Sequence, residues 1–162
     1  MQKSTPPENL KKTKSARKAQ LFLLVFTLLV AVVIWIFWDG DSIESETKTL
    51  TIADAEVLVE VVDTQQAREK GLSGRDDLES GRGMLFVFDE PDFYSMHMQD
   101  MNFSIDIIWL DDDRRVVDII SDVSPDTYPQ TFSPRSAANY VLEVPAGFSE
   151  EYDLVRGSTA SW

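Results

Sequence analysis

Residues 21–38, LFLLVFTLLVAVVIWIFW, form an unbroken apolar run in which Thr27 is the only polar side chain. As a helix, a run of this length extends about 27 Å at roughly 1.5 Å per residue, which is close to the hydrocarbon thickness of a bilayer. Trp35 and Trp38 near its end are suited to the boundary between lipid and water. The run from Leu21 to Trp38 therefore predicts a single transmembrane helix, which makes the membrane the first expected partner of this chain.

The residues on either side of the run indicate its orientation. Residues 1–20 contain six Lys or Arg side chains and one acid, Glu8, and basic flanks stay on the cytoplasmic side of a membrane. We therefore expect residues 1–20 to be a cytoplasmic tail and the chain from Asp39 onward to be extracytoplasmic, held by an uncleaved signal anchor. A cleavable signal peptide is the alternative, but the run is longer than the usual core of about 7–15 residues and no small-residue cleavage pattern follows it.

Charge differs between the two ends of the chain. The formal net charge is −13 at pH 7, although the first twenty residues hold six of the fifteen basic side chains and only one of the 28 acidic ones. Because residues 21–38 are uncharged, residues 39–162 carry a formal charge of −18. This excess repels phosphates, which excludes nucleic acid as a partner and keeps the domain off anionic lipid surfaces. Both a salt-adapted protein and an ordinary acidic secreted domain have such a composition.

The sequence contains no cysteine. Disulfide bonds, thiolate metal sites and a cysteine nucleophile are therefore excluded, and we predict no cofactor. The domain must be stable through its apolar core, and a chain of roughly 115 ordered residues buries enough surface for that.

The exported part begins with a tether and continues as one domain. Residues 39–47 are acidic and aperiodic, which predicts a short linker. Apolar residues then alternate, so we expect residues 48–162 to form a single β-rich domain. Its first two strands are predicted over residues 48–53 and 56–62, with the intervening Asp54-Ala55 as the turn.

Two short helices are expected in this domain. Asp63 or Thr64 is suited to the N-cap of a helix over residues 65–70, and Gly71 is suited to the position after its end. The second helix is predicted over residues 145–153, where Pro145 stands near the start and acidic residues follow in the first turns.

Further strands follow the same apolar patterning. Pro91 in the sequence DEPD predicts a turn that ends a strand, and residues 124–136 contain three prolines without periodicity, which predicts a long loop. The remaining strands are expected over residues 84–88, 93–98, 105–110, 116–123 and 139–144. The fold class predicted is mainly β (α+β), a compact, curled antiparallel sheet or barrel-like domain with two short helices.

The stretch from Phe93 to Asp113 holds three of the five methionines and the only histidine of the chain. Thioethers suit monovalent copper, so Met96, Met98 and Met101 suggest a soft-metal site. In an extended strand, however, Met96 and Met98 face one side and His97 the other. The three sulfurs then converge only if the chain turns at Gln99-Asp100, with His97 pointing away. Methionines that fill a core are the commoner case.

His97 also raises the possibility of a hydrolase. It requires a nucleophile and an orienting acid, which Ser95 or Ser104 and Asp106 nominally supply, with Asp126 or Tyr128 from the long loop as further participants. No Gly-x-Ser-x-Gly elbow and no second histidine support this arrangement.

Asp106 is an acid inside the apolar strand SIDIIWLD. A carboxylate in such a place must face solvent, pair with an arginine, or accept hydrogen bonds from backbone amides. Arg68, Arg75 and Arg82 are the arginines considered as its partner. Such a pair either joins the first helix to the sheet or lines a polar pocket, and the architectural role is favoured.

Several segments together resemble one family in their order and spacing: VEVVDTQQAREKGLSGRDDL, GRGMLFVF, MHMQDMNFSIDIIWLD, VSPDTYP and ANYVLEVPAGF. The family is the uncharacterised domain of unknown function 192, and the likeness extends from about Leu50 to Val155. It implies a compact β-rich fold with small helices, commonly preceded by a signal or anchor segment, and it implies no activity.

The resemblance also marks particular positions. Those that match the family pattern are Arg75, Gly83, Met84, Met98 and Asp106. The sequence departs from it in having His97 where tryptophan is usual, Met96 where phenylalanine is frequent and Ser104 where proline is common, which suggests that residues 96 and 97 occupy places of aromatic packing.

From these observations we predict a membrane-anchored, extracytoplasmic binding or accessory module of the cell envelope. Its candidate binding residues are Arg75, Met98 and Asp106, and its partner is an envelope protein or a small polar ligand. A hydrolase using His97 and Asp106, or copper binding through Met96, Met98 and Met101, are the alternatives.

Overall fold

The computed structural model describes residues 20–32 and 46–162. The chain divides into two compact units, Met1–Ile43 and Glu44–Trp162, which are described separately. The other residues of the predicted tail, membrane span and tether, 1–19 and 33–45, lie outside the described residues.

Residues 20–32 form an α-helix. Its large apolar side chains are exposed, from 41% at Val30 and Val32 to 76% at Phe22. The Thr27 hydroxyl donates a hydrogen bond to the carbonyl oxygen of Leu24 at 2.9 Å, so the one polar side chain of the run is satisfied within its own helix. Within the described ranges, no helix is both long and apolar enough to cross a membrane.

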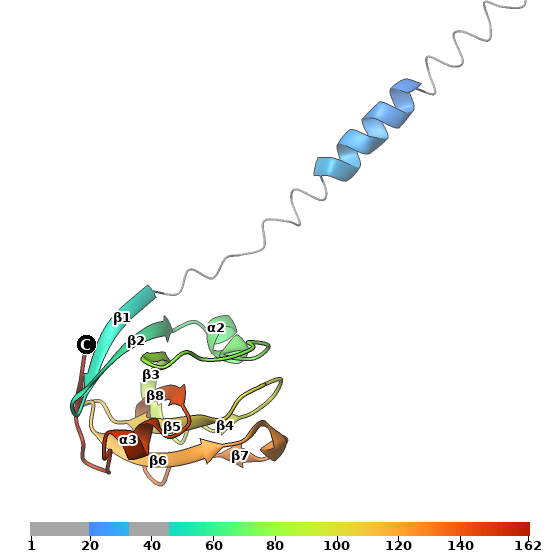
Figure 1. Ribbon diagram of the computed structural model, residues 1–162. Helices are drawn as coiled ribbons and strands as arrows, with labels where there is room; N and C mark the ends of the chain where they lie inside the picture. The colour runs from blue at the N-terminus through green and yellow to red at the C-terminus, as the bar shows by residue number, and fades with distance from the viewer. Residues whose placement is uncertain (1–19, 33–45) are drawn as a thin grey trace, which may run out of the picture. The chain divides into compact units, whose positions relative to one another are not determined.

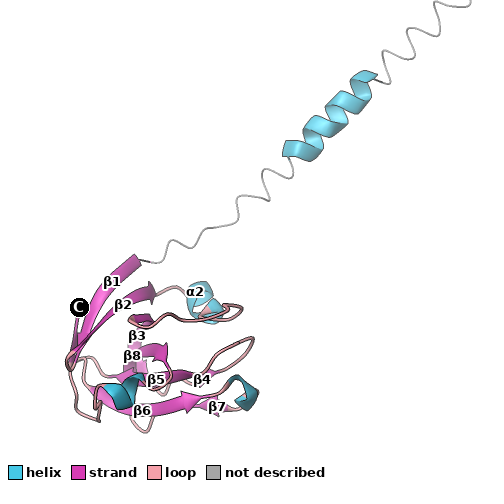
Figure 2. Ribbon diagram, viewed as in Figure 1, coloured by secondary structure: helices cyan, strands magenta, loops and turns pink. Residues whose placement is uncertain are grey.

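The second unit is a curled, mainly antiparallel sheet with few helices, which confirms the predicted β-rich class (Figure 1). Seven strands lie in the order β6-β5-β8-β3-β2-β1-β9, and β4 and β7 form a separate two-stranded sheet. Figure 2 shows that helices are short and peripheral. In chain order the elements are β1 (Glu46–Ile52), β2 (Ala55–Val62), α2 (Gln65–Lys70), β3 (Arg82–Asp92), β4 (Met96–His97), β5 (Ile105–Leu110), β6 (Val116–Val123), the 3-10 helix η1 (Pro125–Thr127), β7 (Thr131–Phe132), β8 (Ala138–Pro145), α3 (Phe148–Glu151) and β9 (Ala160–Ser161).

The first hairpin and helix form close to where the sequence predicts them, but the turn of the hairpin is Ala53-Asp54, and Ala55 already belongs to β2. β1 and β2 pair antiparallel from Glu46↔Val61 to Ile52↔Ala55, and alternate residues such as Leu50 are fully buried. The Thr64 side chain accepts a hydrogen bond from the backbone amide of Ala67 at 3.2 Å and caps α2. Gly71 follows the helix with a positive φ of 47°, a conformation that favours glycine.

Other boundaries differ from the expectation. The DEPD segment does not end a strand, because β3 continues through Pro91 to Asp92. The pairing of β3 with β8 is interrupted between Val87 and Asp92, so the missing amide of the proline disturbs no ladder bond there. The strand predicted over residues 93–98 is reduced to the two residues of β4.

One pairing was not expected at all. β2 and β3 run parallel, with Val59 opposite Gly83, although the rest of the large sheet is antiparallel. A parallel pair needs a crossover connection, and α2 with the loop that follows it provides this connection. The crossover places α2 over one face of the sheet.

Each face of the sheet covers its own apolar cluster. One cluster includes Leu50, Ile108 and Leu142 and continues to Phe148 of α3. The other includes Met84, Met98 and Trp109 and lies on the side of α2. Because neighbouring residues of a strand point to opposite faces, β5 contributes alternately to both clusters, and all six of its residues are buried.

Candidate functional site

A cavity of about 240 Å³ lies beside α2, on the face of the sheet that this helix covers. Figure 1 shows α2 and β4 at the same end of the curled sheet. The cavity is lined from α2 and the residues after it, from β3, from the segment that contains β4, and from β8. Its lining includes Arg68, Glu69, Lys70, Phe86, Phe88, Tyr94, Met96, His97, Met101 and Glu143.

Aromatic rings form one wall of the cavity. Phe88 and Tyr94 stack with their ring centroids 3.5 Å apart and their planes at 10°. The Arg68 guanidinium lies over Phe88 at 5.0 Å and donates a hydrogen bond to the carbonyl of Val87 at 2.8 Å. Arg68 also donates to the carbonyl of Asp63. Its charge is thus held by backbone oxygens and an aromatic face.

Glu143 contributes a carboxyl group to the cavity from the middle of β8. It stands opposite Met84 of β3 and Ile107 of β5, and only 5% of it is exposed. Among the described residues, its carboxyl group has no hydrogen-bond or ion-pair partner. Burial raises the pKa of Glu143 from 4.5 to about 8, so the group is mostly protonated at neutral pH.

Two other buried acids show how this fold normally compensates a carboxylate. Asp106 is fully buried and accepts hydrogen bonds from the backbone amides of Asp122, Gly147 and Ser149 at 2.9, 3.2 and 2.7 Å. Asp118 accepts from the amides of Ile119 and Arg135 and pairs with the Arg135 guanidinium at 3.5 Å. Glu143 is the acid in this group that has no internal compensation.

Asp106 does not form the ion pair with an arginine that the sequence suggested. Instead of facing solvent or pairing with an arginine, the Asp106 carboxylate accepts hydrogen bonds from backbone amides. These bonds join β5 to the end of β6 and to the start of α3. Asp106 therefore fixes α3 against the sheet on the face away from the cavity.

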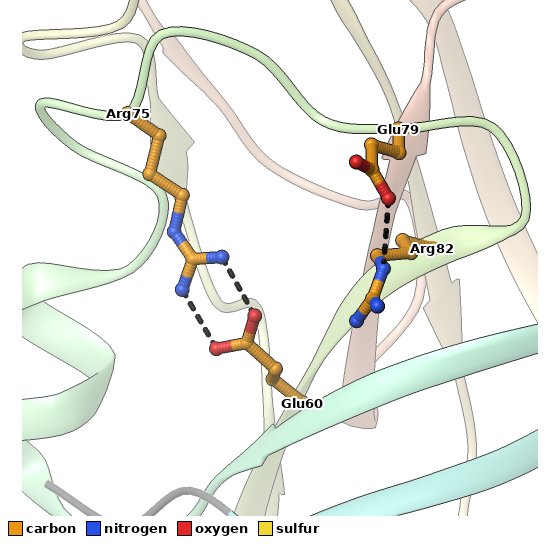
Figure 3. Close-up of polar contacts among 4 residues, drawn as sticks. All are labelled: Glu60, Arg75, Glu79 and Arg82. Atoms are coloured by element: carbon orange, nitrogen blue, oxygen red, sulfur yellow. Dashed lines mark hydrogen bonds and ion pairs between the residues drawn. The ribbon is translucent and has the colours of Figure 1, made fainter.

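The three arginines considered for Asp106 have other partners. Arg75 donates two parallel hydrogen bonds to the carboxylate of Glu60, both at 2.7 Å, as Figure 3 shows. This bond raises the pKa of Arg75 above its ordinary value. In the same view Arg82 donates to Glu79 at 3.2 Å. Arg68 is held by the two carbonyls described above.

Arg75 belongs to a set of contacts that connects the loop after α2 to the turn after β4. The Asn102 side chain donates to the carbonyl of Arg75 at 2.7 Å, and the amide of Gly74 donates to the carbonyl of Asp100 at 2.8 Å. The Ser73 hydroxyl donates to the carbonyl of Gln99 at 2.9 Å. Within the described part of the chain, Arg75 and Asp106 share no polar partner, and neither lines the cavity.

The methionines divide between core and cavity. Met98 is 1% exposed and packs in the cluster with Trp109, whereas Met96 and Met101 line the cavity together with His97. The chain does turn at Gln99-Asp100, with a hydrogen bond from the Met101 amide to the Met98 carbonyl at 3.3 Å. His97 is exposed where Met96 is half-buried, yet it lines the same cavity as Met96 and Met101.

The residues of the proposed hydrolase are not assembled in the described structure. Asp106 is surrounded by backbone amides, and the Nδ1 atom of His97 accepts a hydrogen bond from the Gln99 amide at 3.3 Å. Ser95 is hydrogen-bonded to Ser133 at 2.6 Å. The ring of His97 contacts Tyr128 edge-on at 6.1 Å between centroids. No acid orients the imidazole among these contacts.

Sequence reasoning missed Glu143. The signal was present, because Glu143 stands between Leu142 and Val144 in the strand NYVLEV just as Asp106 stands between two isoleucines. What the sequence does not reveal is that the one acid is compensated by distant amides and the other is not.

Comparison with known proteins relates the chain to uncharacterised proteins. Residues 48–162 match the family DUF192, described as uncharacterized ACR. A UPF0127 protein of Thermococcus gammatolerans is 32% identical over 104 residues, which are 64% of this chain and 65% of that protein. Another from Thermococcus kodakarensis is 38% identical over 68 residues, 42% of this chain and 41% of that protein. The chain thus spans less than two thirds of the length of these relatives.

Two solved structures share the fold. One is a proposed transcription regulator from Sinorhizobium meliloti, with a TM-score of 0.68 over 72% of this chain and 94% of that one. The other is a protein of unknown function from Novosphingobium aromaticivorans, with a TM-score of 0.70 over 76% of this chain and 90% of that one. Each is 23% identical to this chain, so the likeness establishes the fold alone.

Proposed function

The chain belongs to the uncharacterised DUF192 family, and on this premise we propose that its β domain binds a small ligand in the cavity beside α2. In this proposal the segment from Leu21 to Trp38 anchors the chain in the cell membrane, and the domain lies on the extracytoplasmic side as a binding module of the envelope.

The observation that carries the proposal is the carboxyl group of Glu143, which has no partner among the described residues, in a cavity with aromatic and thioether walls. Buried polar groups in native proteins nearly always have partners, and an exception calls for a reason. Apolar concave sites with few polar groups are the usual form of ligand pockets, which are about 300–1,000 Å³ for drug-sized molecules. A cavity of about 240 Å³ suits a smaller molecule.

The anchor rests on separate grounds. The uninterrupted apolar run, the basic residues before it and the acidic ones after it support a membrane span with the N-terminus in the cytoplasm. The described part of this run, residues 21–32, is helical, and its large apolar side chains are exposed.

The Sinorhizobium meliloti structure is described as a proposed transcription regulator, but a DNA-binding role does not suit this chain. Residues 39–162 carry a formal charge of −18, which repels the phosphates of DNA. Between the two partners predicted from the sequence, the cavity favours a small ligand over an envelope protein, because it is a concave site with a carboxyl group inside it.

The proposal is tested with methionine-methyl NMR of the full chain in detergent micelles while a library of small metabolites is added. We expect a ligand that raises the unfolding temperature to shift the methyl signals of Met96 and Met101, which line the cavity, and to leave that of Met1 unchanged. The variant Met101→Trp, which puts a bulkier side chain at the wall of the cavity, should weaken or abolish both effects.

The matched control is Val155→Trp, at an exposed position that does not line the cavity. It should retain ligand binding. Ligands that stabilise the Met101→Trp variant as well as the wild type, or a library without any ligand that shifts Met96 and Met101, would contradict the proposal.

A further inference from the structure

We infer that the ligand of the cavity is a small organic cation, an amine with an apolar body, whose ammonium group pairs with Glu143. This inference rests on the proposed function and specifies the chemical class that the cavity accepts. Four observations lead to it.

The first observation is the missing partner of Glu143. Asp106 and Asp118, the comparable buried acids of this sheet, are compensated by backbone amides and by Arg135. Glu143 is 95% removed from solvent by the fold, yet no amide or cation within the described chain reaches its carboxyl group. A buried carboxylate is stable only when it is paired, so the ionised form of Glu143 requires a partner from outside.

The second observation is the chemistry of the walls. Phe86, Phe88, Tyr94, Met96 and Met101 give the cavity aromatic faces and thioethers. Aromatic faces attract ammonium groups, most strongly where water is excluded, and thioether side chains adapt to irregular apolar bodies. Such walls suit the apolar part of an amine and also add to the attraction of its charge.

The third observation is that the other charged and titratable groups of the cavity do not compensate Glu143. They are Arg68, Glu69 and Lys70 from α2, and Tyr94 and His97 from the segment that contains β4. Arg68 is already bound to two carbonyls and to the Phe88 ring. The Tyr94 hydroxyl donates to the carbonyl of Glu90 at 2.7 Å. Burial alone accounts for the raised pKa of Glu143.

The fourth observation is the charge of the whole domain. A formal charge of −18 over residues 39–162 raises the local concentration of cations and lowers that of anions. The negative charge of the domain would repel an anionic ligand as it approached, and an ionised Glu143 would repel it again inside the cavity.

Binding is coupled to a proton. At neutral pH the free protein holds Glu143 as the neutral acid. When an ammonium ion binds, the carboxyl group releases its proton to the buffer and pairs with the ligand as the carboxylate. Because only the ionised carboxyl group pairs with the ammonium, the dissociation constant should fall roughly 50-fold between pH 6 and pH 8 for a pKa of about 8.

The experiment compares three probes of the same size and different charge: benzylamine, benzyl alcohol and benzoate. Calorimetry of the full chain in detergent micelles is performed at pH 7 in two buffers of different ionisation enthalpy. We expect benzylamine to bind at least tenfold more tightly than either other probe, to release nearly one proton per molecule, and to shift the methyl signals of Met96 and Met101.

The variants separate the role of Glu143 from general charge. Glu143→Gln should lose the preference for benzylamine and the release of the proton, while it still admits benzyl alcohol. Glu143→Leu provides a second variant of similar bulk without a polar group. The matched control, Glu69→Gln, removes an acid that also lines the cavity but is exposed, and it should change the affinity for benzylamine by less than about threefold.

The outcomes distinguish this inference from the proposed function. Benzyl alcohol could shift the methyl signals of Met96 and Met101 while benzylamine binds no more tightly, or benzoate could bind best. Either result would refute the preference for a cation but leave the proposal of a ligand-binding cavity intact. If Glu143→Gln binds benzylamine as well as the wild type does, the pairing is refuted. If none of the probes affects the cavity methyl signals, and the metabolite library likewise yields none, the proposed function itself fails.

Discussion

Single carboxyl groups carry most of what is unusual about this domain. Asp106, Asp118 and Glu143 are all buried in one sheet, and they differ in what surrounds them. The first two accept amide hydrogen bonds and contribute to the architecture. Glu143 has apolar neighbours and a raised pKa, so it makes the domain sensitive to pH.

We expect Glu143 to make stability fall as the pH rises. The folded pKa of about 8 lies above the ordinary value of 4.5, so between these values the folded protein keeps a proton that the unfolded chain has released. The stabilisation is fully present below pH 4.5 and is lost as the pH rises through 8, at up to about 1.4 kcal/mol per pH unit and on the order of 5 kcal/mol in total.

Urea unfolding of the wild type and of Glu143→Gln between pH 5 and pH 9 measures this effect. The amide cannot ionise, so the variant should lack the decline and become the more stable protein at pH 9. Glu79→Gln, at an exposed acid, serves as the control and should follow the wild type. Parallel curves for wild type and Glu143→Gln would contradict the expectation.

Removal of the Asp106 carboxylate should destabilise the domain, whereas removal of the Glu143 carboxyl group should stabilise it at high pH. Asp106→Ala leaves three backbone amides without their acceptor, at Asp122, Gly147 and Ser149. Hydrogen bonds to a charged group contribute about 1.5–3 kcal/mol each, and they are not additive. We expect a loss of about 3–5 kcal/mol in the free energy of unfolding, measured by urea denaturation at pH 7.

The exposed acid Asp112 provides the control for this substitution, since Asp112→Ala should change stability by less than about 0.5 kcal/mol. A loss at Asp106 no greater than that at Asp112 would show that the three amides find other acceptors.

Among the elements, the strands with clear alternation were predictable and the connections between them were not. The strand over residues 105–110 has the predicted bounds, and the hairpin of β1 and β2 differs by a residue or two. These strands are recognisable in the sequence because their apolar residues either alternate with polar ones or form a continuous run. The parallel pairing of β2 with β3 depends on where α2 packs, which no local pattern encodes.

The candidate site, too, was predictable only where local sequence patterns determine the structure. The common role of methionines as core residues applies to Met98, which was also a candidate binding residue, whereas the cavity is formed by residues from four separate segments. The acceptors of Arg75 and the donors to Asp106 lie 15 to 43 positions away in the chain. Sequence reasoning identified an unusual acid in a strand, and only the folded chain distinguishes an acid held by amides from one that faces a cavity.

At the same scale, the contact between β3 and β8 allows one sharp test. A Cβ atom on Gly83 would lie 2.8 Å from the carbonyl oxygen of Glu143 and 3.1 Å from a methyl group of Val144. Gly83→Ala therefore forces the two strands apart, and we expect a loss of about 1–3 kcal/mol in the free energy of unfolding. The same measurement on Thr49→Ala, at an exposed strand position, gives the baseline. A neutral effect of Gly83→Ala would mean that the strands separate without cost.

At the scale of the whole molecule, the proposed anchor predicts a topology. If residues 21–38 span the membrane and the N-terminus stays in the cytoplasm, protease added to intact spheroplasts should digest the C-terminal domain and leave a fragment with an N-terminal tag. We expect immunoblots against tags at either end to show this asymmetry. Protection of the C-terminal domain in intact spheroplasts, with digestion only after lysis, would refute the extracytoplasmic location.

The chain ends beside the strand with which the domain begins. β9 pairs with β1 through Thr51↔Ser161 and Ile52↔Ala160, and Trp162 packs edge-on against Tyr140 and under the Arg114 guanidinium. β9 thereby occupies the backbone groups at the Thr51–Ile52 end of β1. Without this pairing, that end of the strand would offer unpaired backbone groups to a strand of another molecule.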